Sequence, residues 1–242
     1  YEFLFVGKDE NCFLESYAYY LYVEHGEKSG EIFINLEIQN NPVDAEEIAG
    51  VIFETMQKVF FEDMERDPYT RFEIALKAVN GVLAQFKEQK SSGYIGNLNV
   101  IIAGIIGDDL LLTQSGDAEA YLVRKRYVSI VSEGLSEESS GTDVFSSIAS
   151  GKIEIGDIVL FSTTRLVRYI SKNDLAESVH KRDIAESLAD LRDRVSTEIL
   201  GRVGLTGILF SQATRDEEAV LEEGSDSINR SILQTNGSHV SS

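Results

Sequence analysis

Residues 98–131 read LNVIIAGIIGDDLLLTQSGDAEAYLVRKRYVSIV and contain two consecutive hairpin patterns. The first nine residues are almost wholly apolar, which is typical of a strand buried on both faces. A Gly-Asp-Asp turn follows, and Leu110–Gln114 is expected to return beside that strand. Ala118–Arg124 and Tyr127–Val131 make the second pattern, with Lys125-Arg126 at its tip. This succession of hairpins predicts antiparallel sheets.

Towards the N-terminus, the sequence predicts one more hairpin and two helices. Strand-like stretches at Phe13–Glu24 and Glu31–Ile38 flank a polar turn that contains glycine. Asp44 opens an Asp-x-x-Glu capping-box pattern, so a helix is expected to begin near it. Pro68 suits the first position of a second helix. Apolar residues recur three and four positions apart in both helices, so each has one face to bury.

Towards the C-terminus, strand and helix patterns continue. The sequence predicts a short helix within Asp143–Ser150 and a buried strand at Ile158–Thr163. Helices are expected over Asn173–Val179 and Asp183–Leu200, and Leu205–Ser211 is expected to form a last strand.

The order of these elements predicts the fold class. Hairpins dominate and a regular alternation of strand and helix is missing, so the class is α+β. Because the helices are amphipathic, we expect a four-layer α-β-β-α sandwich, with two antiparallel sheets face to face and helices on both outer faces. Residues 1–213 are assigned to this domain. Residues 214–242 are acidic and Ser-rich without sustained periodicity, so they are expected to form a flexible tail or linker.

The composition limits the classes of partner. Lys and Arg total 22 against 41 Asp and Glu, which gives a net charge of −19. Nucleic acid and an anionic membrane surface are therefore unfavourable partners. No apolar run approaches the roughly 20 residues that span a bilayer, so no membrane insertion is expected in this segment. The chain begins with Tyr1, which suggests a fragment or a processed form, and we expect it to be cytoplasmic.

Two segments carry a resemblance to a known family. Ser115–Arg124 (SGDAEAYLVR) resembles the GDSRaYl.R segment of the type 2C, or PPM, metal-dependent Ser/Thr phosphatases. Ile148–Ser162 (IASGKIEIGDIVLFS) is similar to that family's i.sG.l..gD.lll.S stretch. The resemblance covers about Phe13–Gln212 and implies the same α-β-β-α sandwich. It also implies structural roles for the matching residues, which are Gly116, Asp117, Tyr121, Gly151, Gly156 and Asp157.

The resemblance further implies two divalent metals, Mn²⁺ or Mg²⁺, held by carboxylates, but the metal positions are degenerate. Glu37 and Ile38 stand where the family has the Asp-Gly of its DG.GG motif. Thr164 and Arg165 replace the Asp-Gly of its SDG motif, and a cation at Arg165 would oppose metal binding. Val203 aligns with the Asp of the terminal DN.T motif. We therefore predict no catalytic residues, no metal ligands and no cofactor.

These positions favour a pseudophosphatase-like function. The domain is expected to act as a regulatory or scaffolding module that binds a protein partner or a neighbouring domain of the full-length chain. One alternative is an active Mn- or Mg-dependent phosphoserine/threonine phosphatase with ligands at Glu37, Asp44 or Asp143. Another is a homo-oligomer or assembly subunit that uses exposed strand edges or the tyrosine-rich strand.

Several single residues have two interpretations. Asp117 suits a turn whose side chain caps backbone amides better than it suits a catalytic role. Arg165 and Arg168 are more often paired with carboxylates than used to bind phosphate. Cys12 is expected to be an ordinary packed or surface thiol.

Overall fold

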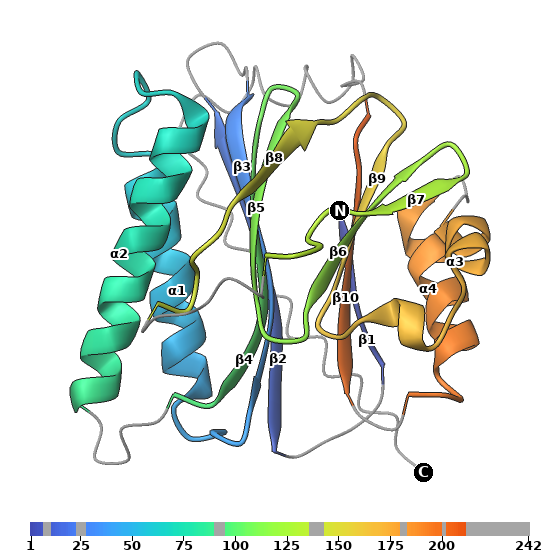
Figure 1. The fold of residues 1–242 in the computed structure, drawn as a ribbon, viewed down its shortest axis with the longest axis horizontal. Coiled ribbons are helices and arrows are strands. Elements are labelled where there is room, and N and C mark those ends of the chain that lie inside the picture. Colours follow the sequence, from blue (N-terminus) through green and yellow to red (C-terminus); the bar gives the residue numbers. More distant parts are fainter. Residues whose placement is uncertain are drawn as a thin grey trace, which may run out of the picture.

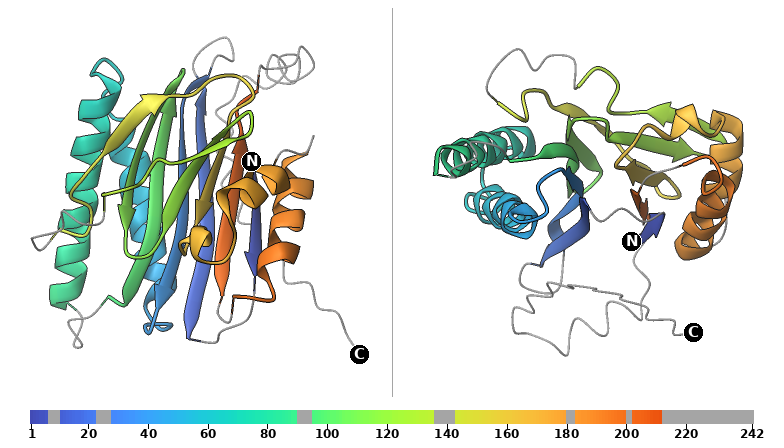
Figure 2. Two further views of the ribbon diagram at one scale, coloured as in Figure 1. Left: turned by 45° about the vertical axis from the view of Figure 1, so that its right-hand side comes forward. Right: turned by 90° about the horizontal axis from the view of Figure 1, so that it is seen from below.

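The protein is a sandwich of two antiparallel sheets with a pair of helices on each outer face (Figure 1, Figure 2). The computed structural model describes residues 1–6, 11–22, 28–89, 95–135, 143–179, 183–199 and 202–211. The predicted tail at 214–242 lies outside these residues. The α+β four-layer architecture predicted from the sequence is confirmed.

One sheet carries the first helix pair. Its strands run in the order β2-β3-β4-β5-β8. They comprise β2 (Cys12–Tyr22), β3 (Lys28–Gln39), β4 (Asn97–Ile106), β5 (Asp109–Ser115) and β8 (Ala149–Lys152). Helices α1 (Ala45–Phe60) and α2 (Pro68–Gln89) cover its outer face.

The other sheet carries the second helix pair. Its strands run in the order β1-β10-β9-β6-β7. They comprise β1 (Glu2–Val6), β10 (Val203–Leu209), β9 (Ile158–Ser162), β6 (Glu119–Arg124) and β7 (Tyr127–Ile130). After the short 3-10 helix η1 (Leu166–Arg168), helices α3 (Lys172–Val179) and α4 (Ile184–Val195) cover its outer face.

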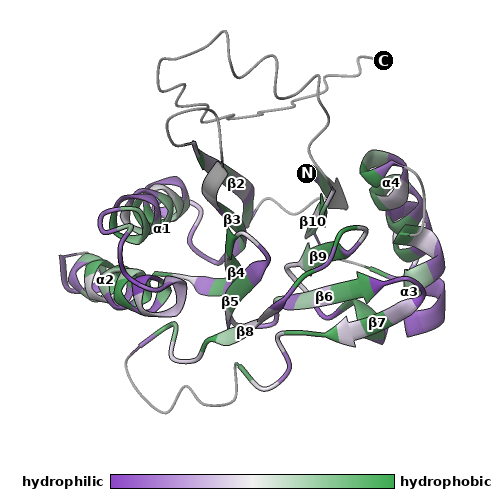
Figure 3. Cartoon of the chain, turned by 90° about the horizontal axis from the view of Figure 1, so that it is seen from above, coloured by the Kyte–Doolittle hydropathy of each residue, from purple (hydrophilic) through white to green (hydrophobic). Residues whose placement is uncertain are grey.

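Three apolar layers hold the sandwich together. One lies between the first sheet and α1 and α2, one between the two sheets, and one between the second sheet and α3 and α4. In Figure 3 the apolar faces of the helices turn towards the sheets. Strand β4 contributes side chains to both of its layers and is buried along nearly its whole length, as its apolar sequence predicts.

Two tyrosines of β2 pack against aromatic side chains of the helical layer. Tyr17 stacks on Phe53 of α1 with ring centroids 4.7 Å apart, and Tyr19 lies 5.4 Å from Phe61.

Two local predictions are wrong, and one holds in part. Residues 143–148 form no helix and β8 begins at Ala149; the Val144 and Phe145 amides donate to the Asn80 side chain of α2. Helix α1 begins directly after Asp44, as predicted, but the Asp44 side chain makes no capping hydrogen bond. Helix α4 ends at Val195, short of the predicted Leu200.

The strand β1 was not predicted. It pairs with β10 through register contacts from Glu2–Gly207 to Val6–Val203, which no local pattern reveals.

Candidate functional site

Carboxylates from both sheets converge at one end of the sandwich, and the first of them is Glu37 of β3. Glu37 is only 3% exposed, although it is ionisable. The side-chain amide of Asn99 on β4 donates to Glu37 Oε2 at 2.6 Å. The Cys12 thiol donates to Oε1 at 3.0 Å. Both carboxylate oxygens therefore already accept a hydrogen bond inside the protein.

Asn99 links Glu37 to the second carboxylate, that of Asp117. Asn99 Oδ1 accepts the backbone N–H of Asp117 at 2.8 Å. A single side chain on β4 thus joins the end of β3 to the β5–β6 turn.

Two arginines hold the Asp117 carboxylate. Arg168 Nη1 donates to Oδ2 at 2.6 Å and Nη2 donates to Oδ1 at 2.9 Å, which is a bidentate pair. Arg165 Nε lies 3.3 Å from Oδ1, and the Thr164 hydroxyl donates to Oδ2 at 3.2 Å. Among the described residues, Asp117 thus binds side chains and not the backbone amides that the sequence suggests. The pairing of both arginines with a carboxylate agrees with the more common of their two interpretations.

Polar contacts join the two sheets beside this cluster. Asn35 Nδ2 donates to the Gly204 carbonyl at 3.2 Å, and the Ser16 and Thr206 hydroxyls lie 3.0 Å apart. The Thr163 hydroxyl accepts the Gly204 amide at 3.1 Å.

Tyr121, on β6, is fully buried. Its hydroxyl donates to Glu119 and accepts the Leu166 amide at 2.7 Å. Burial and the adjacent Glu119 raise the pKa of the Tyr121 phenol far above its ordinary value, so it stays protonated. Its hydrogen bond to Leu166 fixes the start of η1, which carries Arg168.

The residues present do not fit two divalent cations. The Asp117 oxygens accept the Arg168 guanidinium and the Thr164 hydroxyl, and each Glu37 oxygen accepts one internal donor, so a metal would have to compete with these groups. Two guanidinium groups stand beside Asp117 and would repel a cation at that carboxylate. Within the part of the chain that is described, no group of three or more His, Cys, Asp or Glu side chains is placed to hold a metal ion.

Only some of the sequence-derived positions meet here. Glu37, Thr164 and Arg165 belong to this cluster, together with Asp117. The side chain of Ile38 packs under α1 and α2, and that of Val203 packs under α3 and α4, so neither reaches it.

The two remaining candidate ligands, Asp44 and Asp143, form no metal-holding group with this cluster among the described residues. Asp44 hydrogen-bonds with Asn41 before α1, and Asp143 is exposed beside the segment that Asn80 of α2 holds.

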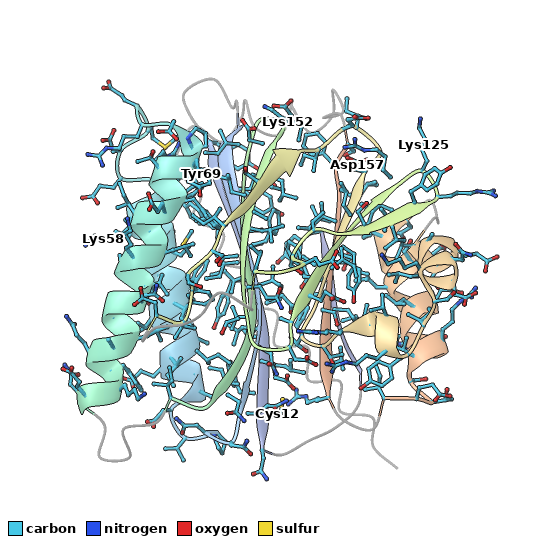
Figure 4. All side chains as sticks on the ribbon, viewed as in Figure 1. Cys12, Lys58, Tyr69, Lys125, Lys152 and Asp157 are labelled. Carbon is cyan, nitrogen blue, oxygen red and sulfur yellow. The ribbon has the colours of Figure 1, made fainter. Side chains whose placement is uncertain are left out.

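Three family-like residues, Gly151, Gly156 and Asp157, lie at the opposite end of the sandwich, where Figure 4 labels Asp157 far from Cys12. Asp157 accepts Arg124 Nε at 2.9 Å, Arg124 Nη2 at 2.7 Å and the Glu154 amide at 2.7 Å. Gly156 precedes it with a positive φ of 92°, and Gly151 lies on β8 opposite Leu110.

Sequence reasoning passed over Asn99, which links the two carboxylates. Its signal is a single polar residue inside the otherwise apolar stretch 98–106. A buried amide in such a run needs polar partners, so its presence indicates a polar site nearby. Cys12 carries no comparable signal, because its partner Glu37 is 25 positions away.

No family model matches the sequence, and no curated protein matches it. Solved structures do match the fold. A mutant of a bacterial serine phosphatase superposes with a TM-score of 0.63 at 11% identity, covering 84% of this chain and 100% of that one. The S. agalactiae serine/threonine phosphatase gives 0.57 at 10% identity, covering 87% and 100%. The catalytic domain of the phosphatase PstP in complex with two manganese ions gives 0.56 at 15% identity, covering 81% and 98%.

These structures share the sandwich over most of the chain. The fold is therefore that of the type 2C Ser/Thr phosphatases, as the two sequence segments imply. At 10–15% identity the similarity extends to the fold alone.

Proposed function

We propose that this domain has the fold of a type 2C phosphatase without its hydrolytic activity, and that it acts as a regulatory or scaffolding module that binds a protein partner or a neighbouring domain. The observation that carries the proposal is the Asp117 carboxylate held by Arg168 and Arg165, at the end of the sandwich where both oxygens of Glu37 also accept internal hydrogen bonds. The cofactor-free state and the cytoplasmic location predicted from the sequence are part of the same proposal.

The chemistry of the guanidinium group supports this proposal. Arginine neutralises a carboxylate and stays charged at any physiological pH. It cannot lower the pKa of a bound water or act as a Lewis acid, as a divalent metal does. A site neutralised by arginine is therefore stable without metal and lacks the group that would activate a nucleophile.

The first test is a calorimetric titration of Mn²⁺ into the metal-stripped chain, with hydrolysis of an aryl phosphate followed in parallel. We expect no saturable binding at micromolar Mn²⁺ and no turnover above the buffer rate. Binding of about two ions with turnover would contradict the proposal.

A second test rebuilds the missing charge. The double variant Thr164→Asp, Arg165→Gly adds a carboxylate beside Asp117 and removes one guanidinium. We expect it to bind Mn²⁺ at least about tenfold more tightly than the parent chain. Thr164→Asn, Arg165→Gly is the matched control, because it has the same shape without the new charge. Equal Mn²⁺ affinities in the two variants would show that a carboxylate at position 164 does not create a cation site.

The alternative is an active phosphatase with ligands from Glu37, Asp44 or Asp143. It requires turnover by the unmodified chain, which Glu37→Ala would abolish. The observation against it is that, among the described residues, Glu37, Asp44 and Asp143 form no group placed to hold a metal ion.

A further inference from the structure

The two sheets end in four edge strands, and these differ greatly in length. Strands β1, β7 and β8 have 5, 4 and 4 residues, whereas β2 has 11. Among the described residues, β3 is the only strand that pairs with β2, so β2 forms an edge of its sheet (Figure 3). Natural edge strands are usually short or interrupted by lysine or proline, because a long open edge pairs with other chains.

The sequence of β2 provides little of that protection. Its residues CFLESYAYYLY contain one charge, Glu15, and no lysine or proline. Its register with β3 is continuous from Cys12 to Leu21. The strand is therefore straight, regular and nearly uncharged, in a protein whose net charge is −19.

Three hydrogen bonds show which backbone groups of β2 face outward. The Asn40 amide donates to the Asn11 carbonyl at 3.0 Å, so Asn11 and every second residue after it bond to β3. The alternate residues turn away from β3, as two contacts confirm. The Cys12 carbonyl accepts Arg202 Nη1 at 2.9 Å, and the Ser16 amide donates to the carboxylate of Glu15 at 3.0 Å. Leu14, Ser16 and Ala18 therefore direct their backbone groups outward.

The geometry points to a second copy of this chain as the occupant of this edge, with β2 pairing antiparallel to β2 about a two-fold axis at Ser16. In this register Leu14 faces Ala18 of the second copy and Ser16 faces its own equivalent. About six backbone hydrogen bonds form, two for each facing pair. The two five-strand sheets then join into one continuous sheet.

This register is compatible with the one charge in the strand. Glu15 lies opposite Tyr17 of the second copy, so no two carboxylates face each other. The Tyr17 hydroxyl is a donor that suits the carboxylate released from Ser16. Burial raises the pKa of the Glu15 carboxyl, the Ser16 amide lowers it, and Glu46 raises it further. The Ser16 amide at the centre of the edge is thus bonded to the Glu15 carboxylate, and this hydrogen bond must break before the amide can pair with a second copy.

The expected dimer is weak and sensitive to salt. A contact through one strand edge is small, and interfaces below about 1,000 Å² are weak, so we expect the dimer to dissociate on dilution. Each copy carries −19, and salt shortens the range of this repulsion from about 8 Å at 0.15 M to about 3 Å at 1 M. The dimer fraction therefore rises with added NaCl.

Sedimentation of the full chain over a range of concentrations, combined with hydrogen exchange, tests this inference. We expect the mass to increase towards that of two copies. Protection of the Leu14, Ser16 and Ala18 amides should increase in parallel, while the amides of Glu15 and Tyr17, which bond to β3, stay unchanged.

Three results would overturn the inference. They are a single-copy mass at all concentrations, a dimer without protection at these amides, and protection that is independent of concentration. The last result would show that a segment of the same chain covers the edge.

Glu15→Gln and Ala18→Pro should shift the monomer–dimer equilibrium in opposite directions. Glu15→Gln weakens the hydrogen bond from the Ser16 amide to residue 15 and removes a negative charge. We therefore expect the dimer affinity to increase about threefold or more. Glu88→Gln, at an exposed position of α2, makes the same change in net charge elsewhere and is the matched control.

Ala18→Pro removes an outward amide without removing a bond to β3 and should abolish the dimer. Its thermal unfolding shows whether the fold survives. If Ala18→Pro does not fold, the dimer affinities of Glu15→Gln and Glu88→Gln are compared instead. Equal dimer affinities in these two variants would overturn the inference.

Discussion

Two Gly-Asp dipeptides lie at opposite ends of the sandwich and use the same residues in opposite ways. At Gly116-Asp117 the backbone is crowded, because a Cβ atom on Gly116 would lie 2.2 Å from the Leu98 carbonyl oxygen. At Gly156-Asp157 the same atom would meet nothing within 4 Å. The two carboxylates differ in the opposite sense: the one beside the uncrowded glycine is buried, and the one beside the crowded glycine is accessible. Only 3% of the Asp157 side chain is exposed, whereas 35% of the Asp117 side chain is exposed.

The difference separates structural support from a surface site. Asp157 acts through its side chain, which binds Arg124 and the Glu154 amide inside a loop. Gly116-Asp117 acts through its backbone, which lies against β4, while the Asp117 carboxylate remains accessible together with Arg165 and Arg168. Charges at the Asp117 end can therefore change with less effect on folding than charges at the Asp157 end.

Gly116→Ala should have the largest effect on stability. Its φ of 69° already disfavours alanine, and the new methyl group would overlap the Leu98 backbone. We expect a loss of more than about 3 kcal/mol, or loss of folding, measured by urea unfolding. A loss under 1 kcal/mol would mean that the turn moves freely away from β4.

Asp157→Asn should have the next largest effect. Removing the charge weakens its bonds to Arg124 and to the Glu154 amide, so we expect a loss of about 1–3 kcal/mol, or a Tm lower by about 2–10 °C.

The pH dependence of stability checks the cause of this effect. Burial raises the pKa of Asp157, but the Arg124 and Glu154 donors hold it below its ordinary value. The contribution is therefore present above about pH 4 and is lost as the pH falls through the folded-state pKa. The parent chain should lose more stability below pH 4 than the variant does, and parallel curves would contradict this assignment.

Gly156→Ala tests the backbone at the same end. Its φ of 92° is unfavourable for alanine, but the space around it is open. We expect a loss of about 1–2 kcal/mol in urea unfolding, clearly less than for Gly116→Ala. Equal losses at the two glycines would remove the contrast in crowding between the two turns.

Asp117→Asn should have the smallest effect on stability. The pairs with Arg165 and Arg168 are partly exposed to solvent, so their net contribution is at most about 1 kcal/mol. Thermal unfolding of Asp117→Asn beside Asp157→Asn measures the difference between the ends directly. A Tm loss as large as that of Asp157→Asn would show that the accessible site is also a structural support.

Much of the fold follows from local patterns in the chain. Period-two and apolar stretches identify the β2–β3, β4–β5 and β6–β7 hairpins, and Pro68 identifies the start of α2. The short elements are harder to predict. β8 and β1 have weak local patterns, and each exists because a distant strand, β5 or β10, supplies its hydrogen bonds.

The sequence by itself determined the class of fold, because burial periodicity and turn residues act over a few positions of the chain. It also identified Glu37, Thr164 and Arg165 as altered positions, by comparison with the DG.GG and SDG motifs of the family that it resembles. Only the tertiary structure decided which residues neutralise one another. Asp117 and Arg168 are 51 positions apart, and Glu37 and Asn99 are 62 apart. Their pairing depends on strand order and register, which arise from packing across the whole sandwich and not from any local pattern.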